Sequence, residues 1–344
     1  MTCPIGNQRK YHGLWHDEKC ASNEKIPMTN KLELPQLQIK PTSVLMAFLS
    51  LSIALIAVSF AAIFIRWMEL ELGPNATIFN RLWIASVVLG GWTALNQQRA
   101  RLTDETLTRE KRSLTREDFW LLIAVGTVAS TSLGFWAWSL TQTRVANSTV
   151  LRNLTPIFTC LGGWLIWGRR FDGRFLSGMA IALVGAIALG VSDLQIATEN
   201  FLGDAAALVS AMFYGINLLI VEQLRGKLPA SRILLWRCAI GTLLTLPIVL
   251  CTETRVFPAS PTGWLSAIAL AVICQAIGQG LLVHSLKRLS AAFVAIALLL
   301  EPILTTILAW IFFAEQLTFS NGLAFAVVLV GIYLAKSSQS TQKA

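Results

Sequence analysis

Four charged side chains stand inside long apolar stretches of this 344-residue sequence: Arg81, Arg152, Arg237 and Glu301. A charge at the centre of a bilayer costs about 3 kcal/mol on insertion scales, so each of the four is a functional candidate. Arg81 and Arg237 each lie four residues inside an apolar stretch, close enough for the side chain to reach the nearer membrane surface. We therefore expect Arg81 and Arg237 to have a structural role. Arg152 and Glu301 remain the candidates for a role in substrate binding or proton transfer.

Arg152 lies deeper, seven residues into its stretch, which is about 10 Å at 1.5 Å per helical residue. Its neighbours Asn153 and Thr155 can exchange hydrogen bonds with a solute, and Pro156 frees a backbone carbonyl one turn earlier. These features favour a wet cavity in which Arg152, Asn153 and Thr155 contact a substrate. A structural ion pair and a strained path to the surface are the alternatives for Arg152.

Glu301 is the one carboxylate at the centre of an apolar stretch, and it directly precedes Pro302. Burial favours the neutral form of a carboxyl group, which suits Glu301 to carry a proton as well as to contact a substrate. The alternatives are a neutral glutamic acid bonded to a neighbouring helix and an ion pair with Arg152. Pro156 and Pro302 are predicted to act as hinges.

Further substrate-binding candidates are polar or aromatic residues within apolar stretches. Gln275 and Gln279 recur at i and i+4 and give one helix a polar face, which in a membrane points inward. Asn217 is a similar single candidate. Trp138 is a candidate to line a cavity together with Phe135 and Trp136, and lipid-facing packing is the alternative for these aromatic residues.

Catalytic and metal-binding motifs are missing from the sequence. It has no H-E-x-x-H, no G-x-S-x-G and no P-loop, so we expect neither an enzyme nor a primary ATP-driven pump. Cys3, His12, His16 and Cys20 stand near the start of the chain, but their spacing does not fit a zinc finger. We therefore expect no metal site and no cofactor.

The elements that position these residues are membrane-spanning helices. The chain is 54% hydrophobic with a mean hydropathy of +0.60, and 14% of its residues are charged, where a soluble domain has about 25%. The apolar stretches are long and show no period-two alternation, which indicates helices. Ten segments are predicted to cross the bilayer: 44–65, 77–95, 119–143, 145–168, 175–192, 205–221, 233–250, 264–286, 289–314 and 317–335.

The distribution of basic residues orients these segments. With a cytoplasmic N-terminus, the inner loops carry 14 lysines and arginines and the outer loops carry three, as the positive-inside rule requires. The net charge of +9 is thereby explained without a nucleic-acid partner. The predicted polar parts are a disordered cytoplasmic tail (1–43), a charged cytoplasmic loop (96–118) and a cytoplasmic C-terminal tail (336–344).

The sequence also repeats internally. A shift of 146 residues aligns 134–185 with 280–331 without a gap and places Thr155-Pro156 opposite Glu301-Pro302. Five segments in each half make the halves enter the membrane from opposite sides, which is a transporter architecture with its site near the midplane. The predicted fold is an all-α membrane protein with ten transmembrane helices as two inverted five-helix repeats around a central cavity.

The second half resembles a known family. "GDAAALVSAMFYGIN" (203–217), "LEPILTTILAWIFFAEQLT" (300–318) and "LVGIYL" (329–334) are similar to the EamA repeat of the drug/metabolite transporter superfamily. The resemblance covers 44–335, with repeats at 44–192 and 203–335, and implies a cavity bordered by spans one, three, four, six, eight and nine. The first half departs from the pattern: Arg169 stands opposite Glu315 and Thr155 opposite Glu301.

These observations favour a secondary active transporter that moves a small organic metabolite, such as an amino acid or another zwitterion or anion, by alternating access. The resemblance implies export rather than import. The expected location is the plasma or inner membrane, with the bilayer and a small molecule as partners; homodimerisation is left open. The alternatives are a membrane enzyme acting on a lipid-linked substrate and a receptor or scaffold that does not transport.

Overall fold

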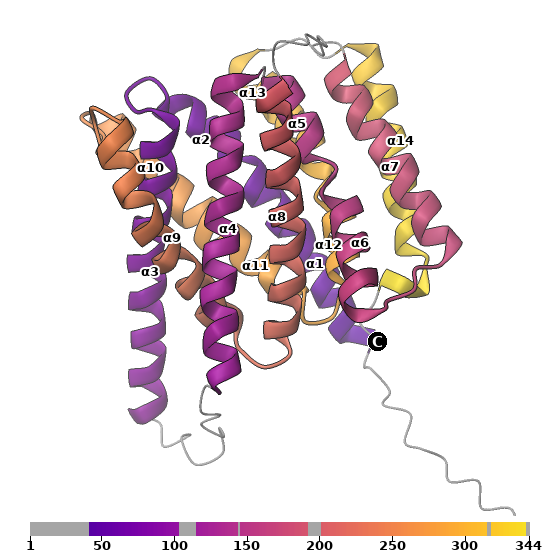
Figure 1. Ribbon diagram of the computed structural model, residues 1–344, viewed down its shortest axis with the longest axis horizontal. Helices are drawn as coiled ribbons and strands as arrows, with labels where there is room; N and C mark the ends of the chain where they lie inside the picture. Colours follow the sequence, from indigo (N-terminus) through magenta and orange to yellow (C-terminus); the bar gives the residue numbers. More distant parts are fainter. Residues whose placement is uncertain (1–40, 103–114, 144, 192–200, 315–317, 342–344) are drawn as a thin grey trace, which may run out of the picture. The chain divides into compact units, whose positions relative to one another are not determined.

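The apolar stretches are helical in the computed structural model, which describes residues 41–102, 115–143, 145–191, 201–314 and 318–341 (Figure 1). Within these ranges eight segments are long and apolar enough to cross a membrane, and Gly173–Leu189 is a shorter apolar helix. All regular elements of the described residues are helices, so the predicted all-α membrane class is confirmed. The predicted tail with Cys3, His12, His16 and Cys20 lies outside these ranges up to residue 40, as does Glu315.

The helices follow one another with short connections. In chain order they are α1 (Pro41–Ser59), α2 (Ala61–Met68), α3 (Pro74–Leu102), α4 (Arg116–Gln142), α5 (Val145–Arg152), α6 (Thr155–Trp167), α7 (Gly173–Val191), α8 (Phe201–Arg225), α9 (Ala230–Thr252), α10 (Pro261–Ala269), the π-helix η3 (Leu270–Gly278), α11 (Gln279–Ser285), α12 (Ala291–Ala297), α13 (Leu300–Phe313), α14 (Phe319–Lys336) and the short 3₁₀ helix η4 (Gln339–Thr341).

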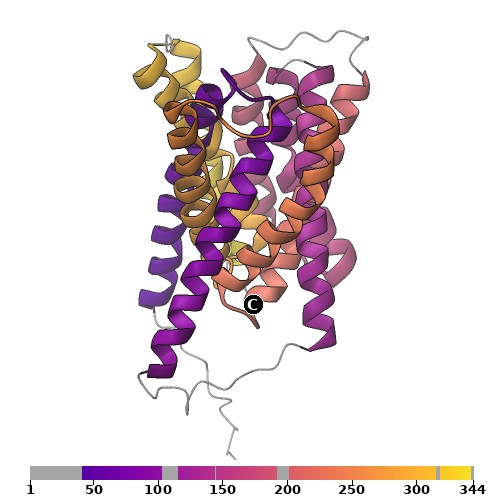
Figure 2. The same cartoon turned by 90° about the vertical axis from the view of Figure 1, so that its left-hand side faces the viewer.

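Several helices extend beyond the apolar stretches that predict them. α1 begins at Pro41, and the charged segment predicted as a loop over 96–118 is helical at both ends, because α3 runs on to Leu102 and α4 begins at Arg116 (Figure 2). The Thr115 side chain accepts a hydrogen bond from the backbone of Asp118, whose side chain accepts one from the backbone of Thr115. This capping box fixes the start of α4 in polar sequence, where hydropathy carries no signal.

Two of the predicted segments are broken at corresponding places. The segment 145–168 divides into α5 and α6, and 289–314 divides into α12 and α13. A shift of 146 residues carries Val145 onto Ala291 and Gly173 onto Phe319, which are the first residues of α12 and α14. It also carries Gly168 onto Ala314, and these two have the left-handed φ angles of +60° and +52°. The two halves therefore follow the same local backbone path here.

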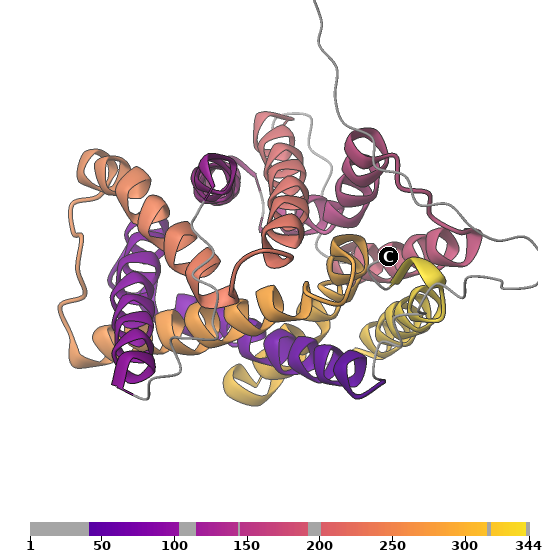
Figure 3. The ribbon, with the colours of Figure 1, turned by 90° about the horizontal axis from the view of Figure 1, so that it is seen from below.

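The last helices of the two halves, α7 and α14, pack side by side (Figures 1 and 3). Small residues permit this close approach. A Cβ atom added to Gly185 would lie 2.8 Å from the backbone nitrogen of Val328, and one added to Gly331 would overlap the backbone of Ala182. Gly331 is therefore a packing residue.

Gly331→Ala is expected to destabilise the protein by about 1–3 kcal/mol, because the added methyl group meets backbone that has little room to move. Thermal unfolding in detergent micelles measures the change. Gly322→Ala on the same helix is the matched control, because nothing lies within 4 Å of its added Cβ atom. Equal melting temperatures for the two variants would contradict this account of the contact.

A buried carboxylate, that of Glu222, bonds two other chain segments near the start of α12. All seven residues of α12 are buried. Glu222 of α8 is fully buried, accepts a hydrogen bond from Arg169 Nη1 at 2.8 Å and accepts another from the backbone nitrogen of Ala291 at 3.3 Å. One side chain thus connects α8, the segment after α6 and the first residue of α12.

Glu222→Gln is expected to lower the free energy of unfolding by about 2 kcal/mol, the value of a hydrogen bond to a charged group. The amide keeps one acceptor for Ala291 but removes the charge that pairs with Arg169. Denaturation in micelles measures the loss. Glu117→Gln, at an exposed position near the start of α4, should leave stability unchanged, and a similar loss in both variants would exclude a specific role for Glu222.

Candidate functional site

Three arginines occupy the same position relative to the first residue of their helices. Arg81, Arg152 and Arg237 each stand seven residues after the first residue of their helix, in α3, α5 and α9. At 1.5 Å per residue this is about 10 Å from the helix start. The contacts of Arg81 and Arg237 do not favour the prediction that these side chains extend to the membrane surface, because α3 and α9 begin three residues before the apolar stretches at 77 and 233 and both arginines bond to buried glutamines.

Two glutamines hold Arg81 and Arg237. Arg81 Nε donates to Gln275 Oε1 at 2.7 Å, and Arg237 Nη1 donates to Gln279 Oε1 at 3.1 Å. Both glutamines are buried, at 2% and 5% exposure, in η3 and at the start of α11. The polar face predicted for Gln275 and Gln279 therefore exists, and it contacts arginines. A π-helix at this point is notable, because such helices occur frequently at functional sites.

Arg152 is enclosed by aromatic rings. Its guanidinium lies 4.6 Å from the ring centroid of Trp136 in α4 and 5.2 Å from that of Tyr214 in α8, and Nη1 donates to Ser210 Oγ at 3.2 Å. Ring faces attract cations most strongly where water is excluded. The arrangement holds Arg152 against neighbouring helices, and these contacts favour an interior place for its guanidinium.

Glu301 supplies the negative charge of the cluster. It lies in the first turn of α13, and the charges of Arg152 and Arg81 act on its carboxylate. Among the described residues, no carboxylate comes within 4.0 Å of the guanidinium of Arg81, Arg152 or Arg237. The direct ion pair between Glu301 and Arg152 is therefore absent in this conformation. With ordinary protonation, three positive charges and one negative charge leave this arginine–glutamate cluster with a net charge of +2.

The Thr155 side chain stabilises the break between α5 and α6. Its hydroxyl donates to the backbone oxygen of Arg152 at 2.7 Å, and the side chain is buried. Pro156 lacks the N–H that would bond this carbonyl in a continuous helix, so Thr155 replaces that bond. The predicted substrate contact of Thr155 is thereby weakened. Asn153 stands within the break, and the corresponding break in the second half lies just before Glu301 and Pro302.

Asn217 is buried without a partner. It is 0% exposed, and within the described part of the chain neither Nδ2 nor Oδ1 has a hydrogen-bond partner. The Nε1 atom of Trp136 is in the same situation. Helical spacing of i, i+4 and i+7 puts Ser210, Tyr214 and Asn217 on one face of α8. An unpaired buried polar group costs about 1–3 kcal/mol, so we expect a water molecule or a solute to bind here.

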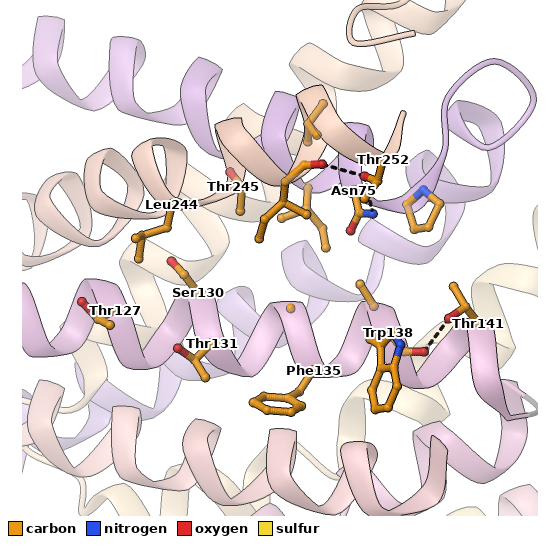
Figure 4. A pocket seen from close by; sticks show the side chains of 16 residues that line it. Asn75, Thr127, Ser130, Thr131, Phe135, Trp138, Thr141, Leu244, Thr245 and Thr252 are labelled. Atoms are coloured by element: carbon orange, nitrogen blue, oxygen red, sulfur yellow. Dashed lines mark hydrogen bonds between the residues drawn. The ribbon is translucent and has the colours of Figure 1, made fainter. Parts of the chain in front are cut away.

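Trp138 lines a cavity whose lining does not include Arg152. The cavity has a volume of about 550 Å³ and lies between α4, the start of α3 and the end of α9, where Asn75, Phe135 and Thr252 also line it (Figure 4). Trp138 is 46% exposed. Trp138 and Phe135 thus line a cavity, as the sequence suggests, whereas Trp136, two residues before Trp138, is the ring beside Arg152.

The helices α3 and α9 correspond under a different shift. A shift of 156 residues carries Pro74 onto Ala230, the first residues of α3 and α9, and carries Arg81 onto Arg237. The shift is ten residues longer than the 146 that relates the later helices, because the first half has the longer charged segment. This correspondence is the signal that could have identified Arg81 and Arg237 as a matched pair.

Comparison with known proteins gives the family. The sequence matches the EamA-like transporter family over residues 45–191 and 201–336. A solved crystal structure covers 86% of this chain and 96% of its own, with a TM-score of 0.72 and 16% identity, and shows the same fold. An uncharacterized transporter of Archaeoglobus fulgidus is 22% identical over 298 residues, covering 85% of this chain and 96% of that protein.

The names of two further relatives state a substrate. The pseudopaline exporter of Pseudomonas aeruginosa is 21% identical over 227 residues, covering 65% of this chain and 78% of that protein. The UDP-galactose transporter 1 of Arabidopsis thaliana is 22% identical over 204 residues, covering 56% of this chain and 59% of that protein. The family matches span most of the sequence, and the helices are those of a multi-pass membrane protein. The chain therefore belongs to the EamA-like transporter family, within the drug/metabolite transporter superfamily, and is a membrane transporter.

Proposed function

We propose that the protein is a secondary active transporter for a small organic metabolite with an acidic group, and that the arginine–glutamate cluster is its binding site. The observation that carries this proposal is the cluster itself. Arg81 and Arg152 come from the first half of the chain and Arg237 and Glu301 from the second. A site shared between halves can open to either side as the halves move, which is what alternating access requires.

The proposed architecture is ten membrane crossings in two inverted repeats of five, with both termini in the cytoplasm of a cell bounded by the plasma or inner membrane. The corresponding helix starts and breaks of the two halves support the repeat. The excess of basic residues in the predicted inner loops supports the orientation. Pro156 and Pro302, beside the two breaks, are the proposed hinges.

The proposed direction is export. The relative from Pseudomonas aeruginosa is named as an exporter. The membrane potential also favours outward movement of a net negative substrate, because an inside-negative potential contributes about 2.3 kcal/mol per charge per 100 mV. Arg152 would neutralise the acidic group while it crosses the apolar part of the protein.

The proposed coupling group is Glu301. Its carboxylate and the acidic group of a substrate compete for the same arginines. When a substrate is bound, its negative charge makes protonation of Glu301 more favourable. Protonation of Glu301 and binding of an acidic substrate therefore support each other, so the pH sets the affinity for the substrate.

Metabolite profiling tests the proposed function. Cells that overproduce the protein are compared with cells that carry the Arg152→Ala variant, and both cell contents and medium are measured. We expect an acidic metabolite to decrease in the cells and to increase in the medium, chemically unchanged, only with the unmodified protein. A new chemical product would indicate an enzyme, and identical profiles for the two proteins would contradict transport through this site.

A further inference from the structure

Arg81 and Arg237 form a matched pair across the two halves of the protein. They correspond under the 156-residue shift, and each bonds the amide oxygen of a glutamine on the same helical segment, Gln275 in η3 and Gln279 four residues later at the start of α11. Their charges act on each other and on Arg152. One such arginine could be incidental, but two at equivalent positions with equivalent partners form a built arrangement.

The contacts of this pair leave most of their hydrogen-bonding capacity for another group. A guanidinium has five N–H donors, and the bonds to Gln275 and Gln279 use one nitrogen of each. The partners are neutral amides, which orient an arginine without cancelling its charge. Arg237 is only 6% exposed, and a buried charge is stable in a protein when it is paired. An anionic ligand would supply the negative charge and the hydrogen-bond acceptors that both arginines lack among the described residues.

From this arrangement we propose that the substrate carries two acidic groups, one bound by Arg81 and the other by Arg237. This inference rests on the proposed function and names the substrate class of the same site. Two acidic groups offset two of the three positive charges that Arg81, Arg152 and Arg237 bring to the cluster. Arginine is suited to each of them, because its planar fork pairs with carboxylate and phosphate oxygens in a bidentate manner.

The residues around Arg152 offer contacts to the carbon skeleton of such a substrate, and Arg152 itself is a further cation for one of its two acidic groups. Trp136 and Tyr214 present ring faces, and the unpaired Nε1 of Trp136 and side-chain amide of Asn217 are available to polar atoms. A diacid with a short carbon skeleton bearing hydroxyl, amino or keto groups would use all of these contacts. A monoacid would leave one arginine of the pair without an anion.

Binding to the purified full-length protein in micelles tests the inference without knowledge of the natural substrate. The probes are unbranched dicarboxylates of four to eight carbons, each compared with the monocarboxylate of equal length by calorimetry and thermal stabilisation. Fructose 1,6-bisphosphate and fructose 6-phosphate form a second pair, which separates phosphate from carboxylate recognition. We expect the two-group member of at least one pair to bind about 10- to 100-fold more tightly, the effect of one additional charged hydrogen-bonded contact. Equal affinity within every pair would overturn the inference.

Two variants and a control identify the arginines responsible. Arg81→Gln and Arg237→Gln should each remove the preference for two acidic groups, whereas Arg116→Gln, at an exposed position in the first turn of α4, should retain it. If either variant fails to fold, Gln275→Leu or Gln279→Leu keeps the arginine but removes its anchor and should reduce the preference. Retention of the full preference in folded Arg81→Gln would contradict the assignment.

The two proposals fail in different ways. Tight binding of diacids without accumulation in vesicles would leave the substrate class intact and contradict transport. Accumulation of a metabolite with one acidic group or none, together with equal affinity in the binding pairs, would support transport and overturn the two-group substrate.

Discussion

Arg152→Ala is expected to raise the apparent dissociation constant for the transported metabolite by about 30-fold or more. Truncating one partner of a buried, hydrogen-bonded charge pair costs about 2–5 kcal/mol, and Arg152 is proposed to be such a partner for the acidic group of the substrate. The variant also empties the space between the rings of Trp136 and Tyr214. The measurement is the concentration dependence of counterflow in proteoliposomes.

Arg152→Lys separates charge from shape in this prediction. A lysine retains one positive charge but has no planar fork, so it is expected to restore part of the lost affinity. Arg116→Gln is the control for removal of an arginine from the exposed start of a helix and should behave as the unmodified protein. An unchanged apparent affinity in Arg152→Ala would limit Arg152 to holding Ser210 and the two rings.

Glu301→Gln is expected to abolish the response of transport to pH while leaving counterflow intact. Glutamine has nearly the shape of a protonated glutamic acid but cannot release a proton or compete for the arginines as an anion. In the unmodified protein, the affinity for an acidic substrate should increase as the pH falls and Glu301 becomes protonated. The variant should show the high affinity of the acidic condition at every pH.

The measurement for Glu301 is uptake driven by a pH gradient, paired with counterflow at equal pH on both sides. Glu222→Gln is the matched control, because it removes another buried carboxylate that lies outside the cluster. A Glu301→Gln protein that responds to the gradient as the unmodified protein does would contradict the coupling role. Loss of counterflow as well would show that Glu301 is needed for binding or folding.

The sequence was sufficient to predict the helical membrane class and to single out Arg152 and Glu301 as charges within apolar stretches. Both follow from long apolar stretches, which are the strongest signal that a membrane protein carries. The same signal does not reveal the partners of Arg81 and Arg237, because hydropathy marks an apolar stretch and not which helices pack together. These arginines bond to Gln275 and Gln279 of other helices.

The identity of the ring beside Arg152 could not be predicted either. Trp136 and Trp138 stand two residues apart on α4, so they point to different sides of the helix, and sequence alone does not say which side faces α8. Thr155 shows a similar limit. A hydroxyl next to a proline serves equally well as a ligand contact or as a replacement for the missing backbone bond, and its distance to the Arg152 carbonyl favours the second role.

Counterflow of a labelled acidic metabolite in proteoliposomes tests the central claim most directly, namely that this protein transports such a molecule through the arginine–glutamate cluster. The label is placed on the metabolite that profiling identifies, and vesicles are loaded with the unlabelled compound. We predict a transient accumulation of the unchanged labelled molecule with the unmodified protein and with Arg116→Gln. At a metabolite concentration near the apparent dissociation constant of the unmodified protein, we predict far less accumulation with Arg152→Ala. Equal accumulation by Arg152→Ala and the unmodified protein, or binding with no accumulation by either, would contradict the account.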